Sequence, residues 1–279
     1  VEFYTNGAKL GEITGPPYSL TWSNVPAGDY LLLARALCGD GQVTNSSAVT
    51  VRVRPLLTIT AQSTNKIYGA PLPVFTAAYS GFVNGDTPTN LDTPPLLSTT
   101  ATAASPVGSY PISASGAADP DYIIAYASGT LTVTPAPLTV EADDKSRLYG
   151  ATNPVLTVTY TGFVNGDGAS ALSGALMLTT PAGTNSPVDA YPIIPTGLTA
   201  TNYTLTFSNG TLHVTARPLS ATADHQSRAY GAANPPLTGT LTGIQYGDNI
   251  AASYSTAAEV HSPVGTYSIV PTLGDPDSK

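Results

Sequence analysis

The stretch Gly162-Phe-Val-Asn-Gly-Asp167 decides the fold, because the chain of 279 residues contains it more than once. It occurs as Gly81-Phe-Val-Asn-Gly-Asp86 and, in an altered form, as Gly243-Ile-Gln-Tyr-Gly-Asp248, and each copy lies 81 residues after the one before. Similarity of a chain to itself at a fixed period is typical of tandem repeats. The sequence therefore predicts several small domains of one kind.

A Tyr-Gly pair marks each copy at the same spacing. The three pairs are Tyr68-Gly69, Tyr149-Gly150 and Tyr230-Gly231. Since the tyrosine never changes beside its glycine, we expect its hydroxyl to have a fixed hydrogen-bond partner. Stacking of the ring on a ligand is the alternative interpretation.

Within one copy the residue pattern is that of β-strands. Leu138-Thr-Val-Glu-Ala142 and Tyr203-Thr-Leu-Thr-Phe207 alternate between apolar and polar residues. Asn209-Gly210 then separates two such runs, which predicts a closing β-hairpin. The fold class is therefore all-β, with tandem small domains that are either β-grasp-like or sandwiches.

An aspartate ends each copy of the opening motif. These residues are Asp86, Asp167 and Asp248. A short stretch such as Gly168-Ala-Ser-Ala-Leu172 or Asn249-Ile-Ala-Ala252 follows, and we expect one helical turn there, with the carboxylate capping its free N–H groups.

Residues 1–54 have a different pattern. Tyr30 follows Pro26-Ala-Gly-Asp29, which resembles the corner tyrosine of immunoglobulin-like sandwiches, and Trp22 would be a core aromatic in that frame. The segment resembles the C-terminal half of a bacterial immunoglobulin-like domain. Because its first strands are missing, we expect an exposed sheet edge and low stability in isolation.

From residue 55 onward the chain resembles the MBG domain of the Tyr-Gly type, a repeat of bacterial adhesins. The resemblance rests on Lys145-Ser-Arg-Leu-Tyr-Gly150, Gly162-Phe-Val-Asn-Gly-Asp167, Ser105-Pro-Val-Gly-Ser-Tyr-Pro-Ile112 and Asn209-Gly-Thr-Leu212. It divides the chain into repeats at 55–136 and 137–217 and a truncated repeat at 218–279. The resemblance implies a surface or adhesin-like role, without an activity for the module itself and without functional residues to carry over.

The composition excludes several classes of function. The net charge is −8 and only 10% of the residues are charged, which argues against binding of nucleic acid. No apolar run has the length of a membrane-spanning helix, so we expect no membrane insertion within this segment. A single cysteine, Cys38, is predicted to be a small buried apolar residue rather than a catalytic thiol.

No catalytic motif is present, so we expect a protein that is not an enzyme and has no cofactor. Calcium between repeats is a weaker hypothesis, since oxygen ligands hold this ion. Its candidate ligands are Asp119, Asp121, Asp143 and Asp144. Turn formation and solvation explain these carboxylates equally well.

The leading interpretation is a stalk or spacer of a large bacterial protein, extracellular or at the cell surface. Short, proline-rich junctions such as Pro135-Ala-Pro137 predict a rod in which each repeat adds roughly 30 Å. A module that binds a surface glycan or a protein is the first alternative. An accessory region of a secreted polysaccharide-degrading enzyme is the second.

Overall fold

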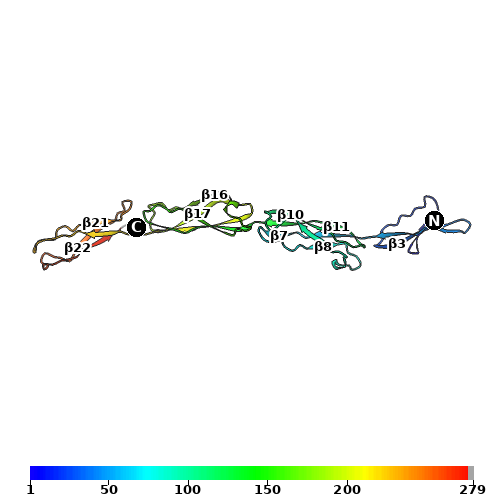
Figure 1. Cartoon of the computed structure of the whole chain (residues 1–279), viewed down its shortest axis with the longest axis horizontal. Coiled ribbons are helices and arrows are strands. Elements are labelled where there is room, and N and C mark those ends of the chain that lie inside the picture. Colours follow the sequence, from blue (N-terminus) through cyan, green and yellow to red (C-terminus); the bar gives the residue numbers. More distant parts are fainter. Residues whose placement is uncertain (276–279) are drawn as a thin grey trace. The chain divides into compact units, whose positions relative to one another are not determined.

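The computed structural model describes residues 1–275, which form β-strands, turns and loops (Figure 1). The helices among these residues are two 3-10 turns of three residues each. The predicted all-β class is therefore confirmed. The chain divides into two compact units, Val1–Thr134 and Pro135–Lys279, and the last four residues of the predicted third repeat, 276–279, lie outside the described part.

The N-terminal segment forms one five-stranded sheet without a second layer. β3 pairs with β1, β4 and β5, and β1 also pairs with β2. No side chain of residues 1–54 is fully buried. Cys38 is exposed, so its predicted burial is wrong, because it lies in the turn between β3 and β4, where its N–H donates to the carbonyl oxygen of Gln42. The strands are β1 (Glu2–Thr5), β2 (Ala8–Glu12), β3 (Gly28–Leu37), β4 (Val43–Asn45) and β5 (Val49–Val53).

Repeat 1 consists of two small sheets. One has the order β11-β6-β8 and the other the order β7-β12-β10-β9. β11 runs parallel to β6 and β12 runs parallel to β7, while the remaining neighbours are antiparallel. The elements are β6 (Leu56–Ala61), β7 (Thr64–Ile67), β8 (Ala77–Ser80), η1 (Pro88–Asn90), β9 (Leu96–Thr99), β10 (Gly108–Ser115), β11 (Ile123–Ala127) and β12 (Gly129–Thr134).

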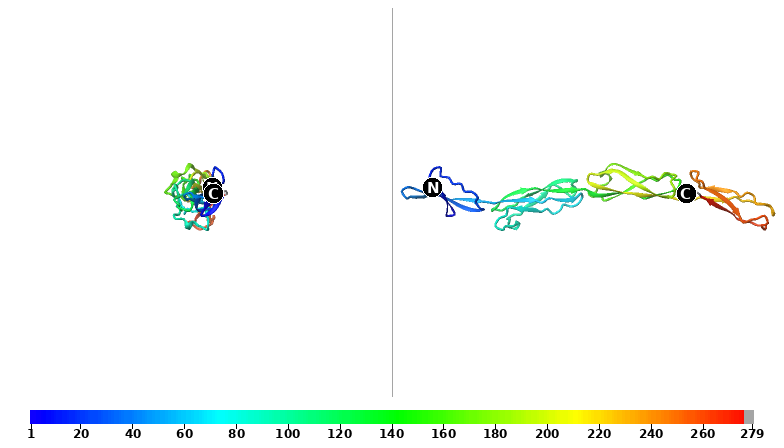
Figure 2. Two further views of the ribbon diagram at one scale, coloured as in Figure 1. Left: turned by 90° about the vertical axis from the view of Figure 1, so that its right-hand side faces the viewer. Right: turned by 180° about the vertical axis from the view of Figure 1, so that it is seen from behind.

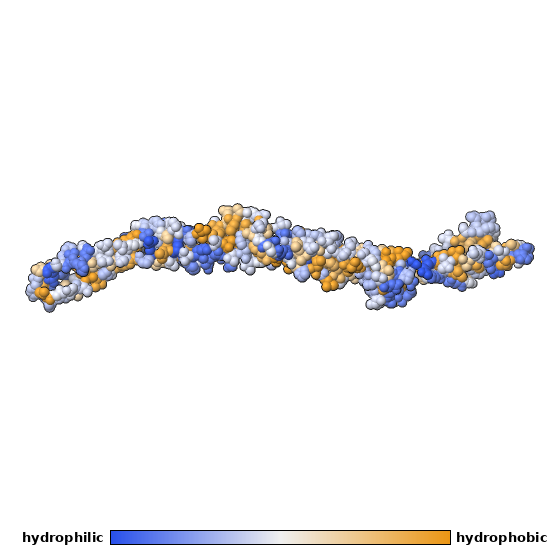
Figure 3. Space-filling model, in the orientation of Figure 1, coloured by the Kyte–Doolittle hydropathy of each residue, from blue (hydrophilic) through white to orange (hydrophobic). Residues whose placement is uncertain are grey.

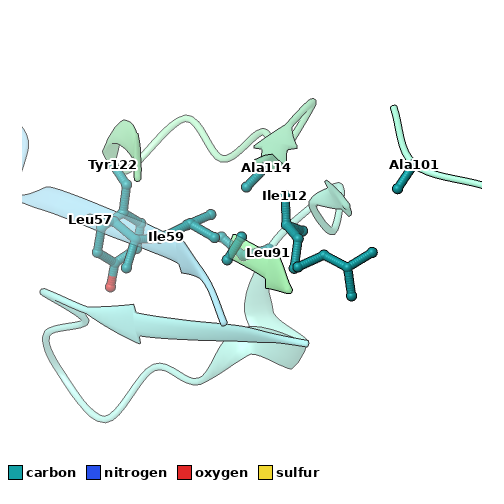
Figure 4. Packing of buried hydrophobic residues seen from close by; sticks show 9 residues of the cluster. Leu57, Ile59, Leu91, Ala101, Ile112, Ala114 and Tyr122 are labelled. Carbon is teal, nitrogen blue, oxygen red and sulfur yellow. The ribbon is translucent and has the colours of Figure 1, made fainter. Parts of the chain in front are cut away.

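The two sheets of repeat 1 enclose a core of apolar side chains (Figure 4). Leu57 and Ile59 of β6 are fully buried, as are Ile112 of β10 and Leu131 of β12. Alternate burial along β6 is what a strand covered on one face requires. Since both sheets contribute to one core and no helix among residues 1–275 packs across a sheet, the arrangement corresponds to the sandwich alternative.

Repeat 2 has the same architecture. Its sheets have the orders β15-β13-β18 and β14-β19-β17-β16, and Val140, Ile193 and Leu212 are fully buried between them. β13 begins at Ala136, one residue before the predicted start of this repeat. The elements are β13 (Ala136–Ala142), β14 (Lys145–Leu148), β15 (Val158–Thr161), η2 (Ala169–Ala171), β16 (Ser173–Thr179), β17 (Asp189–Thr199), β18 (Tyr203–Ser208) and β19 (Gly210–Thr215).

The closing hairpin predicted at Asn209-Gly210 is wrong. β18 pairs with β13 in one sheet, whereas β19 pairs with β14 and β17 in the other, so the chain crosses between sheets at this point. A Cβ atom on Gly210 would lie 2.3 Å from the carbonyl oxygen of Ala142. The glycine is therefore required by a close backbone approach and not by a two-residue turn.

Repeat 3 contains two antiparallel strand pairs within the described residues. β20 (Ser220–Ala223) pairs with β21 (Gly239–Thr242), and β22 (Ala251–Thr256) pairs with β23 (Ile269–Gly274). Figure 2 shows β23, at the red end of the colour scale, beside the orange β22. The helical turn predicted after Asp248 is wrong, because β22 starts at Ala251 in its place.

Apolar side chains also lie at the surface. Figure 3 shows these residues in orange among weakly polar ones. Val74 is 91% exposed and Val155, 81 residues later, is 84% exposed. Single exposed apolar residues are ordinary on a soluble domain. Their recurrence follows from the repeat and does not by itself define a site.

Candidate functional site

The Tyr-Gly pair forms a tight turn in each repeat. In repeat 2 the N–H of Ala151 donates to the carbonyl oxygen of Leu148 over 3.1 Å, and Gly150, the third residue of the turn, has a φ of 80°. A type II turn requires a positive φ at this position, which favours glycine. The turn places Tyr149 at the end of β14. The glycines of the other two pairs have φ values of 81° and 82°.

The side chain of Tyr149 contacts repeat 3. Only 4% of the residue is exposed, and its hydroxyl donates to Oδ1 of Asp248 over 2.9 Å. The predicted fixed partner of this tyrosine is therefore confirmed in repeat 2. Because the ring is buried, it offers no face on which a ligand could stack.

The loop of repeat 3 that receives Tyr149 is a second tight turn. The N–H of Asp248 donates to the carbonyl oxygen of Gln245 over 2.9 Å, and Tyr246 and Gly247 both have positive φ, 50° and 72°. Two such residues in succession are the mark of a type I′ turn. In the first two repeats Asn84 and Asn165 occupy the place of Tyr246, and asparagine tolerates this conformation more easily.

Tyr246 is a bulky residue in a left-handed conformation, which costs about 1–3 kcal/mol. Its hydroxyl donates to the carbonyl oxygen of Gly150 over 3.2 Å, and its ring meets that of Tyr149 edge to face with centroids 6.4 Å apart. Edge-to-face pairs of this kind are favourable. Contacts with repeat 2 therefore offset the backbone strain in repeat 3.

Gln245 completes the junction between repeats 2 and 3. A Cβ atom on Gly150 would lie 2.7 Å from Cγ of Gln245, so the absence of a side chain lets the two loops meet. Gln245 and Tyr246 were not predicted from the sequence, in which the third motif differs from the other two only as an altered copy. The change of sequence was the available signal for this junction. Gln245 and Tyr246 replace the Val-Asn of the other two copies, and both lie against repeat 2.

The motif aspartates bind tyrosine hydroxyls instead of capping helices, so their predicted role is wrong. Oδ2 of Asp86 accepts a hydrogen bond of 2.5 Å from Tyr122. Oδ2 of Asp167 accepts one of 2.6 Å from Tyr203, which occupies the same place in repeat 2. Burial, and then the bond to Asp86, raises the pKa of Tyr122. Asp86 and Asp167 therefore each hold the turn of the motif against the tyrosine at the start of an edge strand of the same repeat.

A tyrosine corner recurs in all four segments of the chain. The hydroxyl of Tyr30 donates to the carbonyl oxygen of Pro26 over 2.8 Å, as expected from the resemblance to immunoglobulin-like domains. Trp22 is half-buried and packs edge-on against this ring at 4.8 Å. The same bond to a proline four residues earlier is made by Tyr110, Tyr191 and Tyr267, at 2.9, 3.0 and 3.0 Å.

The carboxylates considered for calcium make contacts within the protein. Asp143 accepts hydrogen bonds from Thr157 and Thr159, which lower its pKa, and Asp144 accepts one of 2.6 Å from the N–H of Thr211. Oδ1 of Asp119 accepts a bond of 2.8 Å from the N–H of Asp121. Within residues 1–275 no three His, Cys, Asp or Glu side chains gather as a metal site would need.

A buried cation occupies one position in the first two repeats. Lys66 is 6% exposed and donates to the carbonyl oxygens of Ala70 and Ala103, and burial lowers its pKa. Arg147, 81 residues later, is 7% exposed; it donates to Oδ1 of Asn153 over 2.7 Å and to the carbonyl oxygen of Gly183. This position was not predicted from the sequence, because its residue changes from lysine in repeat 1 to arginine in repeats 2 and 3.

We expect Arg147→Lys to destabilise repeat 2 by about 1–3 kcal/mol, because Arg147 reaches Asn153 and Gly183 from two different nitrogens of its planar guanidinium group, which the single nitrogen of lysine does not reproduce. Hydrogen exchange of the strands of repeat 2 measures the change. Arg52→Lys is the matched control, since Arg52 makes an exposed ion pair with Asp29, and it should leave exchange unchanged. Equal effects of the two substitutions would contradict the role of the buried guanidinium.

The fold defines a protein built from tandem all-β repeats, of which repeats 2 and 3 contact each other through turns. The sequence model of the MBG domain (YGX type) matches residues 57–132, 138–213 and 219–277. The chain therefore belongs to this family, as the Tyr-Gly motifs indicated. Comparison with curated proteins finds no match. Among residues 1–275 no helix is long and apolar enough to cross a membrane.

Proposed function

We propose that this chain is a non-catalytic repeat region of a large bacterial protein, extracellular or at the cell surface, and that it serves as a stalk or spacer. MBG repeats occur in surface and adhesin-like proteins, and this supports a location outside the cell or at its surface. The observation that carries the proposal is the bond between Tyr149 and Asp248, because it joins one repeat to the next.

A spacer needs successive domains with a fixed orientation relative to each other, since domains without a contact between them would move independently. β19 ends at Thr215 and β20 begins at Ser220, so four residues link repeats 2 and 3. The hydrogen bonds of Tyr149 and Tyr246 hold the two repeats together in addition to this short linker. Binding of a glycan or a protein and an accessory role beside a catalytic domain stay predictions.

Small-angle scattering of the full chain tests the spacer proposal. A compact particle of this length has a radius of gyration of about 19 Å. We expect a value well above that figure, because a spacer must separate its ends. Gly150→Val, which pushes Gln245 away from the turn, should broaden the distribution of dimensions. A radius near the compact value would overturn the proposal.

A further inference from the structure

The first and the last segment of repeats 1 and 2 lie side by side and run in the same direction. In repeat 2, β13 is parallel to β18 over six partner pairs and β14 is parallel to β19 over four, and all partners lie 67 residues apart in the chain. We call residues 136–148 the first segment and residues 203–215 the last segment. In repeat 1 these segments are 56–67 and 123–134, and they pair in the same way.

The two segments stay bonded where the chain crosses from one sheet to the other. In repeat 2 the N–H of Thr211 donates to Oδ1 of Asp144 over 2.6 Å, between the two stretches of strand pairing. In repeat 1 the N–H of Thr130 donates to the hydroxyl oxygen of Ser63 over 3.0 Å at the same place. Hydrogen bonds therefore join the first segment to the last before, at and after the crossing.

Tension along the chain enters a repeat at the start of its first segment and leaves it at the end of its last segment. In repeat 2 these points are Ala136 and Thr215. Because the segments are parallel, the two points lie at opposite ends of the pairing, and a pull on both slides one segment along the other. This load falls on all the bonds together. A pull at one end of the pairing would break them in turn, and each bond alone contributes little net stability.

Sliding also meets a steric obstacle at the crossing. A Cβ atom on Gly210 would lie 2.3 Å from the carbonyl oxygen of Ala142. Its neighbours Asn209 and Thr211 both have side chains, so a shift of the last segment by one residue in either direction brings a Cβ atom against this oxygen. The same shift would turn the fully buried Leu212 away from the core, because a slip of one residue exchanges the two faces of a strand. The segments therefore cannot yield through small slips.

We propose that repeats 1 and 2 bear tension along the chain, and that the parallel pairing of their first and last segments is the part that resists it. The inference rests on the proposed spacer function, because a stalk that connects two points is pulled from both ends. It goes beyond that function, since a spacer can separate two points without resisting a pull.

Single-molecule force spectroscopy of the full chain with Cys38→Ser tests the proposal. With handles at the two ends of the chain, repeats 1 and 2 are both loaded in the sliding direction. Each should unfold in one step that releases about 280 Å, the extended length of a repeat. The force of each step reports the rate of unfolding under load.

The matched comparison changes only the direction of the pull on repeat 2. Its second handle is attached at Thr201→Cys, an exposed position just before the last segment. The pull then starts at one end of the pairing in repeat 2, while repeat 1 of the same molecule is still loaded in sliding. Repeat 2 should now unfold at about half the force of repeat 1 or less, because its bonds break in turn. Equal forces for repeat 2 with the two handle positions would overturn the proposal.

Two neighbouring aspartates supply matched variants. Asp144→Ala removes the bond to Thr211 at the crossing, so it should speed the unfolding of repeat 2 under a fixed sliding load by about fivefold or more. Asp143→Ala removes bonds to Thr157 and Thr159, which lie outside the two segments, and should leave that rate nearly unchanged. Equal effects of the two substitutions would contradict the role of the paired segments.

Failure of this inference differs from failure of the spacer function. A large radius of gyration, with equally low unfolding forces for the two handle positions, would leave the spacer function and overturn the tension-bearing role. A compact radius would overturn the spacer function, and with it the inference that rests on it, whatever the forces are.

Discussion

Gly210→Val is expected to destabilise repeat 2 by about 3 kcal/mol or more. The obstacle to a side chain is backbone, since a Cβ atom would lie 2.3 Å from the carbonyl oxygen of Ala142 and 2.8 Å from its carbon. The strands must separate to accept valine, and β19 supplies the fully buried Leu212. Hydrogen exchange at the amides of β17 and β19 measures the loss.

Gly168→Val is the matched control for this prediction. Gly168 has no atom within 4 Å of its Cβ position, and its φ of −145° suits any residue. The same substitution should therefore change the stability of repeat 2 little. Gly129→Val should repeat the large effect in repeat 1, where the Cβ would lie 2.4 Å from the carbonyl oxygen of Ala61. Native exchange in Gly210→Val would contradict the close-approach interpretation.

The same glycine shows where prediction from the sequence stops. The period of 81 residues and the alternating runs predicted the repeats and the strands, because strand burial has a period of two. They could not show which strands pair. Asn209-Gly210 has the residues of a hairpin turn, yet β18 and β19 belong to different sheets. A glycine needed for backbone proximity looks the same in sequence as one needed for a turn.

The junction was predictable only in part. The unchanging Tyr149 indicated a fixed partner, and the invariance of Asp248 was visible too, but nothing in their spacing of 99 residues joins them. In the sequence, Tyr246 is seen only as a replacement of the asparagine that the other two copies of the motif have at this place. Only the structure shows that this residue accepts a strained backbone and donates its hydroxyl to Gly150. Contacts between repeats depend on tertiary placement, which local patterns do not contain.

Tyr149→Ala is expected to weaken the junction between repeats 2 and 3 by about 3 kcal/mol. The substitution removes a buried ring, its edge-to-face contact with Tyr246 and the hydrogen bond to Asp248. A carboxylate oxygen that loses its donor adds to the cost. Faster hydrogen exchange at residues 148–151 and 245–248 measures the effect.

Tyr230→Ala provides the comparison within the same chain. Tyr230 occupies the same place in the Tyr-Gly turn, but it is 67% exposed, so its removal should change exchange little. Tyr149→Phe keeps the ring and should lose about 1 kcal/mol, and a double-mutant cycle with Asp248→Ala should show a coupling of about that size, because both substitutions remove the same hydrogen bond. If Tyr149→Ala and Tyr230→Ala had equal effects, the tyrosine would serve only its own turn. A larger effect at Tyr149, coupled to Asp248, would show that this Tyr-Gly turn joins repeat 2 to repeat 3.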